Sequence, residues 1–246
     1  MRKWSPTIAV ILSASIVGCG KNGPSSPAPI ITPDPIPAWR LDRSDAVNWI
    51  AGHHSPSTWM GGGNWLGLGT ELIGDANRGR IVIVKHAPVS FEVLEYDPQW
   101  VYHVEDHGIA YDNVAYAGYS WLTKANERAV WMPRRVTPGW TYANDTWRHL
   151  YAVGSCEVAR VFREPIYSQV FGIETLNAGQ LGTLDVLHSA FFHPGNRQGR
   201  DTGEHYWYSW DYGWIQWRDA THPMGSFFQK NTGPVPTYET PCVDVQ

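Results

Sequence analysis

Polar residues able to do acid–base or metal chemistry are concentrated in one run, His103-Val104-Glu105-Asp106-His107. In an extended strand, alternate residues point to the same side, so we expect His103, Glu105 and His107 to share one face. Imidazole and carboxylate groups on one face can bind a metal ion, and Asp106 can orient a histidine ring. The same residue types also occur on solvent-facing strands. The run therefore supplies four catalytic candidates, and its spacing alone defines no metal site.

The motifs of familiar catalytic sites do not occur in the sequence. It contains no His-Glu-x-x-His, Cys-x-x-Cys or Gly-x-Ser-x-Gly pattern, and the stretch Gly154-Ser155-Cys156 is not a nucleophile elbow. A carboxylate pair for glycoside hydrolysis depends on a separation in space, which a sequence does not give. The glutamates that could form one include Glu92, Glu95, Glu105, Glu174 and Glu204. We therefore expect no cofactor, and we rank binding above catalysis.

Tryptophan and tyrosine are abundant, with 14 and 12 residues, and several fall in one predicted β-hairpin. The hairpin pairs an alternating run over 204–210 with a second over 214–218, and residues 211–213 supply an Asp- and Gly-containing turn. Alternation places aromatic rings on both faces, because Tyr206 and Trp207 are neighbours.

Two uses of these rings remain open. Both faces can be buried in a central strand, or one face can be a solvated platform for the apolar faces of sugar rings. In the second case the candidate ligand-binding residues are Trp207, Trp210, Tyr212 and Trp214. Another aromatic cluster lies in the glycine-rich stretch 59–69, which lacks the Lys-Ser/Thr of a phosphate-binding loop and predicts a surface loop.

The first twenty residues have the order typical of an export signal. Arg2 and Lys3 precede an apolar run over 7–17, and about eleven residues are too few to span a membrane, which needs roughly 20. Small residues then precede Cys19, an arrangement that resembles the lipobox of bacterial lipoproteins. The resemblance implies cleavage of a signal peptide over residues 1–18 and acylation of Cys19, which would hold the protein on a lipid bilayer.

Two alternatives to lipidation are a plain secretory signal followed by an unrelated cysteine, and an uncleaved anchor. If Cys19 is lipidated, the next residue is Gly20 rather than aspartate, which favours the outer membrane over the inner membrane under the sorting rule of enteric bacteria. Residues 19–38 are rich in proline, a composition that predicts an extended spacer between the lipid surface and the folded part.

The cysteine content predicts a disulfide, and the net charge limits the possible binding partners. Beyond Cys19, the chain has only Cys156 and Cys242, and an even pair in an exported protein predicts a disulfide, with two unpaired buried thiols as the alternative. With Arg2 and Lys3 removed, 17 of the 19 basic residues remain against 23 acidic ones, a net charge of −6. A mildly acidic chain without basic clusters offers no surface for nucleic acid, so we exclude that partner.

Residues 39–246 are predicted to form a single β-rich domain. Short β-branched or aromatic runs bounded by Gly, Pro, Asn and Asp predict strands at 80–85, 90–96, 100–104, 129–132, 157–162 and 183–192. Helix is scarce: Ser44 can cap a short helix over 45–50, and 123–128 can form a helical turn. The predicted fold class is mainly β, an antiparallel β-sandwich or barrel-like sheet with one or two short helices.

The hairpin over 204–218 is similar to a closing hairpin of extracytoplasmic β-sheet domains of bacterial lipoproteins, many of undefined function. The stretch 133–140 resembles a connecting turn of that group, although Trp210-Asp211 stands where the pattern more often has a second glycine. This resemblance covers about a tenth of the chain and implies a fold class and no enzyme.

The sequence as a whole predicts an exported lipoprotein, lipid-anchored in the bacterial envelope. Its predicted function is non-catalytic binding of a carbohydrate, an envelope polymer or an envelope protein through an aromatic-rich sheet. The alternative is an envelope hydrolase or lyase, metal-dependent or not, that uses the His103–His107 run.

Overall fold

The structure is a computed structural model that describes residues 36–53, 59–62, 65–86, 90–193, 203–219, 226–227, 229–230 and 237–243. The chain divides into two units, Met1–Pro35 and Ile36–Gln246, and every described residue belongs to the second. The predicted signal peptide, Cys19 and most of the predicted spacer therefore lie outside the described residues.

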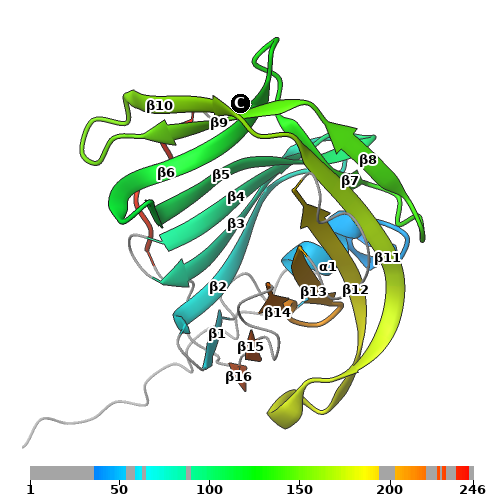
Figure 1. Ribbon diagram of the computed structural model, residues 1–246. Coiled ribbons are helices and arrows are strands. Elements are labelled where there is room, and N and C mark those ends of the chain that lie inside the picture. The colour runs from blue at the N-terminus through cyan, green and yellow to red at the C-terminus, as the bar shows by residue number, and fades with distance from the viewer. Residues whose placement is uncertain are drawn as a thin grey trace, which may run out of the picture. The chain divides into compact units, whose positions relative to one another are not determined.

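Two antiparallel β-sheets pack against each other (Figure 1), which confirms the predicted mainly β, sandwich fold class. Among the described residues, the larger sheet has ten strands. They are β1 (Trp59–Gly62), β2 (Trp65–Gly74), β3 (Gly79–His86), β4 (Ser90–Tyr96), β5 (Trp100–Tyr111), β6 (Val114–Thr123), β7 (Ala129–Pro133), β9 (Thr146–Tyr151), β10 (Val158–Arg163) and β16 (Gln229–Lys230). Their order is β10-β9-β6-β5-β4-β3-β2-β1-β16, with β7 paired to β5.

The smaller sheet has six strands within the described ranges, in the order β15-β14-β13-β12-β11-β8. They are β8 (Thr141–Asn144), β11 (Ile166–Asn177), β12 (Thr183–Phe192), β13 (Glu204–Ser209), β14 (Gly213–Arg218) and β15 (Ser226–Phe227). The predicted strands coincide with β3, β4, the first part of β5, β7, β10 and β12 to within one or two residues, and the predicted hairpin is β13–β14.

The main apolar core lies between the sheets. It combines Ile81 of the larger sheet with Phe191 and Tyr206 of the smaller one. Aromatic rings meet across the gap, because the Trp131 ring centroid is 5.4 Å from that of Phe191 and 5.1 Å from that of Tyr206. Much of the aromatic content therefore packs the two sheets together, which removes large apolar areas from water.

A short helix, α1 (Ala46–Ala51), contacts strands of both sheets. Its N-cap is Asp45 rather than the predicted Ser44: one carboxylate oxygen accepts a hydrogen bond from the Val47 N–H at 3.0 Å. The other oxygen accepts from the Arg134 guanidinium at 2.8 Å. Asp45 is preferred as the cap because its charge also compensates this buried arginine, which a serine cannot do.

Two further local predictions are wrong. Residues 123–128 form a hairpin turn between β6 and β7 rather than a helical turn, since Asn126 adopts a left-handed φ of 61° and the Thr123 N–H donates to the Glu127 carbonyl at 2.8 Å. The described residues of the stretch 59–69, predicted as a loop, form β1 and part of β2, which pair with each other. Backbone pairing within a sheet overrides the low strand propensity of glycine there.

The remaining helical segments among the described residues are two 3₁₀ turns, η1 (Ala38–Leu41) and η2 (Gly179–Leu181). Across the described residues, no helix has the length and apolar character needed to cross a membrane.

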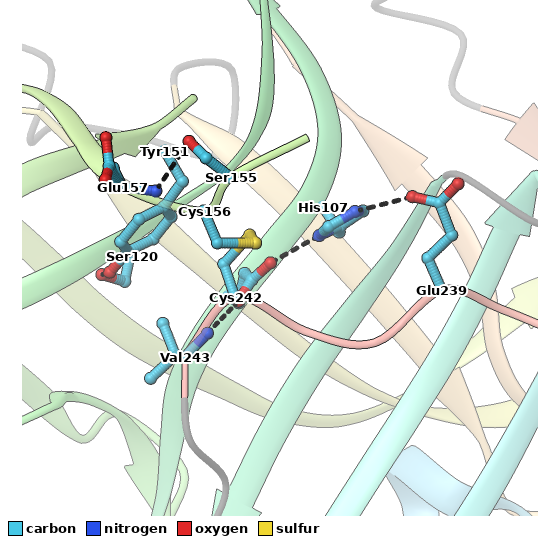
Figure 2. Close-up of a disulfide and its surroundings, with 10 residues drawn as sticks. His107, Ser120, Tyr151, Ser155, Cys156, Glu157, Glu239, Cys242 and Val243 are labelled. Atoms are coloured by element: carbon cyan, nitrogen blue, oxygen red, sulfur yellow. Dashed lines mark hydrogen bonds and ion pairs between the residues drawn. A yellow bond between two sulfur atoms is a disulfide. The ribbon is translucent and has the colours of Figure 1, made fainter. Parts of the chain in front are cut away.

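Residues 237–243, here called the strap, cover the face of the larger sheet that is turned away from the smaller one. Tyr238 and Val243 pack on an apolar cluster of Val82, Val84, Phe91, Val93 and Val104. The predicted disulfide is confirmed: Cys156, just before β10, is bonded to Cys242 of the strap, 86 residues away (Figure 2). A cross-link over this separation restricts the unfolded chain and so stabilises the fold by about 4 to 5 kcal/mol in the chain-entropy model.

Candidate functional site

A β-bulge in β5 divides the His103–His107 run between the two faces of the larger sheet. His103 is opposite Leu94 of β4, but Glu105 is opposite Val93, so Val104 is an extra residue without a partner. Cross-strand partners share a face, and Leu94 faces the inter-sheet core while Val93 faces outward. The prediction that His103, Glu105 and His107 share one face is therefore wrong: the bulge turns His103 inward and the other two outward.

The inward half of the run contributes Asp106 to a buried ionic cluster. The Lys85 ammonium lies 2.6 Å from Asp106 Oδ1 and 3.7 Å from Glu92 Oε2. Glu204, from β13 of the opposite sheet, accepts hydrogen bonds from the Tyr206 hydroxyl at 3.0 Å and from the Trp217 indole at 3.1 Å. Three carboxyl groups from both sheets therefore share the surroundings of one lysine.

Burial and charge shift the protonation of these groups. Burial raises the pKa of Glu92 to about 7, although the Lys85 charge opposes the shift. Burial also raises the pKa of Glu204, against the lowering effect of its indole and phenol donors. Burial alone would lower the pKa of Lys85, but the Asp106 and Glu92 carboxylates outweigh it and raise the pKa. The ammonium is thus held in its charged form, and loss of the proton is made harder for two of the carboxyls, Glu92 and Glu204.

A small cavity of about 110 Å³ opens onto this cluster. Its lining residues are Lys85, Asp106, Glu204, Tyr206, Trp214 and Trp217. Asp106 from the predicted catalytic run and Trp214 from the predicted binding hairpin therefore meet here, although the sequence placed them in separate hypotheses.

His103, the other inward residue, lies among aromatic rings. Its ring centroid is 4.8 Å from that of Trp121 and 5.7 Å from that of Trp131, and its buried Nδ1 has no hydrogen-bond partner among the described residues. Burial, together with the Lys85 and Arg148 charges, lowers the pKa of His103 to about 3. The imidazole is neutral at ordinary pH and is a packing residue in this setting.

The residues of the run that face outward, Glu105 and His107, form a second polar group under the strap. His107 Nδ1 lies 2.5 Å from Glu105 Oε1, and the His107 ring stacks on Phe91 with centroids 4.5 Å apart. Gly118 of β6 makes room for this pair, because a Cβ at that position would come 2.8 Å from Glu105 Oε1. Glu105 and His107 are both buried beneath the strap.

The hairpin residues predicted to bind a ligand are largely packed. Trp207 and Trp214 are 6% and 2% exposed. Trp210 is half-buried, with its ring stacked on His53 at 3.9 Å, and Tyr212 is half-buried against the core. No continuous row of exposed hairpin rings results among the described side chains.

A histidine pair that sequence reasoning did not single out lies on the outer face of the smaller sheet. His188 Nε2 is 2.8 Å from His205 Nδ1, and His188 Nδ1 is 3.2 Å from Glu174 Oε1. The Trp207 indole donates to the same Glu174 oxygen at 2.8 Å, and its ring stacks on His188 at 4.4 Å. The pair depends on register between β12 and β13, so no local spacing in the sequence reveals it.

A larger opening, here called the groove, lies where β5 and β7 approach β8. Its volume is about 470 Å³. Its aromatic lining is Trp100, Tyr102 and Tyr142, and its polar lining includes Glu95, Glu127, Arg128, Asn144 and Asp145. Of these residues the sequence singled out only Glu95, as one of several possible catalytic carboxylates. The groove itself leaves no local signal, because its residues are spread over about fifty positions and meet only through the crossing from β7 to β8.

Neighbouring contacts fix the walls of the groove. The Tyr142 ring stacks on Trp140 with centroids 5.8 Å apart and planes inclined by 5°. The ring centroids of Trp100 and Trp140 are 5.9 Å apart. The Asn144 side chain accepts from the Val130 N–H at 2.8 Å and donates to the Val130 carbonyl at 3.0 Å. Asn144 thereby joins β8 of one sheet to β7 of the other, while Tyr142 remains 42% exposed. Glu95 and Arg128 form an ion pair within the lining.

No protein-family model, curated protein or solved structure matches this chain.

Protonation of Glu92 makes the stability of the fold depend on pH. Glu92 keeps its proton up to about pH 7 when folded, while its ordinary pKa is 4.5. Between these values the folded state binds more protons than the unfolded state, so the free energy of unfolding should fall as pH rises from about 4.5 to about 7. In Glu92→Gln, which resembles the protonated form, urea denaturation across this range should show a clearly shallower decline.

The matched control is Glu157→Gln, because Glu157 is exposed and makes no buried ion pair. This variant should retain the wild-type decline. An unchanged pH dependence in Glu92→Gln would contradict the assignment of the shift to Glu92.

Proposed function

We propose that this protein is an envelope-anchored module that binds a glycan in the groove without catalysis. The observation that carries the proposal is the exposed Tyr142 ring beside Trp100 and Tyr102, in an opening of about 470 Å³ with hydrogen-bonding groups along it. Binding through aromatic residues is the function that the sequence predicts, but the site proposed for it is this groove and not the β13–β14 hairpin.

The chemistry of the lining suits a sugar. Flat aromatic rings stack against the apolar C–H faces of sugar rings, and carboxylate, amide and guanidinium groups bond to hydroxyls. The position of the Tyr102 ring is fixed, because its hydroxyl donates a hydrogen bond to Asp97 Oδ2 at 2.8 Å. Tyr142 is held by its stacking on Trp140. Side chains that are already ordered lose less conformational entropy when a ligand binds than mobile side chains do.

Size distinguishes the groove from the inter-sheet cavity. Ligand pockets usually measure about 300 to 1,000 Å³, and the groove falls in that range while the cavity, at about 110 Å³, does not. Liquid water occupies about 30 Å³ per molecule, so the cavity holds a few waters at most. The alternative is an envelope hydrolase or lyase that uses the His103–His107 run, of which only Asp106 lines this cavity. The small space there supports binding in the groove instead.

The anchor is the second part of the proposal. Its support is the lipobox-like order of residues before Cys19 and the proline-rich residues 19–38 that follow. Acylation of Cys19 would hold the groove near envelope polymers, since each buried methylene contributes about 0.8 kcal/mol to membrane attachment. We place the protein at the outer membrane, with a glycan rather than an envelope protein as its partner.

Removal of one groove ring should weaken glycan binding without unfolding the protein. Tyr142→Ala deletes an exposed ring, so we expect about a tenfold or greater loss of affinity for glycans identified on an array, measured by calorimetry. Tyr142→Phe keeps the ring and should bind within about threefold of wild type. Equal affinity for all three proteins, or no glycan bound by the wild type, would rule out the groove as a glycan site.

The anchor has its own test in a diderm bacterial host. Mass spectrometry of the membrane-bound protein should show a chain that begins at an acylated Cys19, and Cys19→Ala should abolish this species. An intact Met1, or an unmodified Cys19 at the start of the mature chain, would refute the anchor without bearing on the groove.

A further inference from the structure

The strap adds a cysteine sulfur to the outward half of the β5 run. One ligand atom from each of Glu105, His107 and Cys242 lies within 4.8 Å of the other two, and no other such group occurs among the described residues. Glu105 and His107 are buried, and Cys242 is half-buried. Figure 2 shows His107 beside the Cys156–Cys242 bond. While that bond is intact, the Cys242 sulfur is not a thiolate and does not act as a zinc ligand.

We propose that reduction of the Cys156–Cys242 disulfide converts Glu105, His107 and Cys242 into a zinc-binding site. Carboxylate, imidazole and thiolate are the donors that bind Zn²⁺ in proteins, and three protein ligands with one water complete a four-coordinate site. The oxidised protein offers only two of the three donors. Zinc binding is therefore switched by the redox state of the strap.

The chemical steps balance with a dithiol as the reductant. Its two S–H groups become one S–S bond, the Cys156–Cys242 bond breaks, and each cysteine gains one proton and one electron. When Zn²⁺ binds, the proton of the Cys242 thiol passes to solvent, and one His107 ring nitrogen is left unprotonated to bind the ion.

Contacts other than the disulfide keep the strap on the sheet after reduction. The Val243 N–H donates to Glu105 Oε2 at 2.8 Å, and the Tyr238 hydroxyl donates to Glu71 Oε2 at 2.6 Å. These contacts lie on both sides of Cys242 in the sequence. The freed sulfur therefore stays close to the other two ligands.

His107 already has the kind of partner that a zinc-bound histidine uses. Its Nδ1 lies 2.5 Å from Glu105 Oε1, and its Nε2 lies 3.3 Å from Glu239 Oε2. A ligating imidazole gives one nitrogen to the metal and donates the other N–H to a carboxylate, which fixes the ring. Zinc–ligand bonds of about 2.0 to 2.3 Å place the atoms of a tetrahedral ligand set roughly 3.3 to 3.8 Å apart. Ligand atoms up to 4.8 Å apart must therefore approach by about 1 Å. His107 Nδ1 and Glu105 Oε1 must separate by about as much, and side-chain rotations supply both movements.

Two single-cysteine variants of the full chain test the proposal. Cys156→Ser leaves Cys242 as a thiol beside the other ligands, whereas Cys242→Ser removes the sulfur ligand, and both lose the same disulfide. Calorimetry with Zn²⁺ should give one site in Cys156→Ser that is about 100-fold tighter than any in Cys242→Ser. With Co²⁺ as the probe, only Cys156→Ser should show a thiolate-to-metal charge-transfer band in the near ultraviolet.

Wild-type protein provides a measurement that needs no substitution. After treatment with a phosphine reductant, which takes its oxygen from water, and removal of the excess, it should gain the same site, and reoxidation should abolish it. Equal zinc affinity in the two variants, or a cobalt complex without the thiolate band, would overturn the proposal. So would release of the strap on reduction, detected as rapid proteolysis at residues 237–243 in Cys156→Ser.

Discussion

One extra residue in β5 decides which side chains meet in this protein. Because Val104 has no partner on β4, His103 and Asp106 face the smaller sheet while Glu105 and His107 face the strap. In a regular strand, alternation would keep His103 and Glu105 together and send Asp106 to the opposite side. With His103 still facing inward, the inter-sheet ionic cluster would lose Asp106, and Glu105 and His107 would both be turned away from the strap. A bulge of this kind redirects side chains at small cost to the ladder.

The two sheets are joined by polar groups as well as by apolar packing. Lys85 and Asp106 come from the larger sheet and Glu204 from the smaller one, and all three line the same cavity. Buried charges are tolerated only when they are compensated, because the loss of hydration costs several kcal/mol per ion. Three carboxyls around one ammonium are compensated in part by retained protons, most clearly on Glu92. The contact between the sheets therefore includes groups whose protonation depends on pH.

The fold could be predicted from the sequence further than the site. Period-two runs located six of the sixteen described strands, the Asp- and Gly-containing turn located the β13–β14 hairpin, and export signals together with two cysteines predicted the disulfide. The bulge could not be predicted, since an apolar Val104 fits either face and leaves no trace in the periodicity. The groove could not be predicted either, because Trp100 and Tyr142 come together only where the chain passes from β7 in the larger sheet to β8 in the smaller one. Asp45, rather than the expected Ser44, caps helix α1 because it also binds Arg134. Arg134 lies 89 residues away in the sequence, so no local pattern indicates this contact.

The two histidines of the run lie on opposite faces of one sheet, and nuclear Overhauser contacts of their ring protons can distinguish this arrangement from a regular strand. We expect contacts from the His103 ring to Trp121, and from the His107 ring to Phe91, with no aromatic neighbour in common. His103→Gln and His107→Gln assign the signals. Contacts from both imidazoles to the same set of rings would show a regular strand without the bulge, and the two histidines would then share one face.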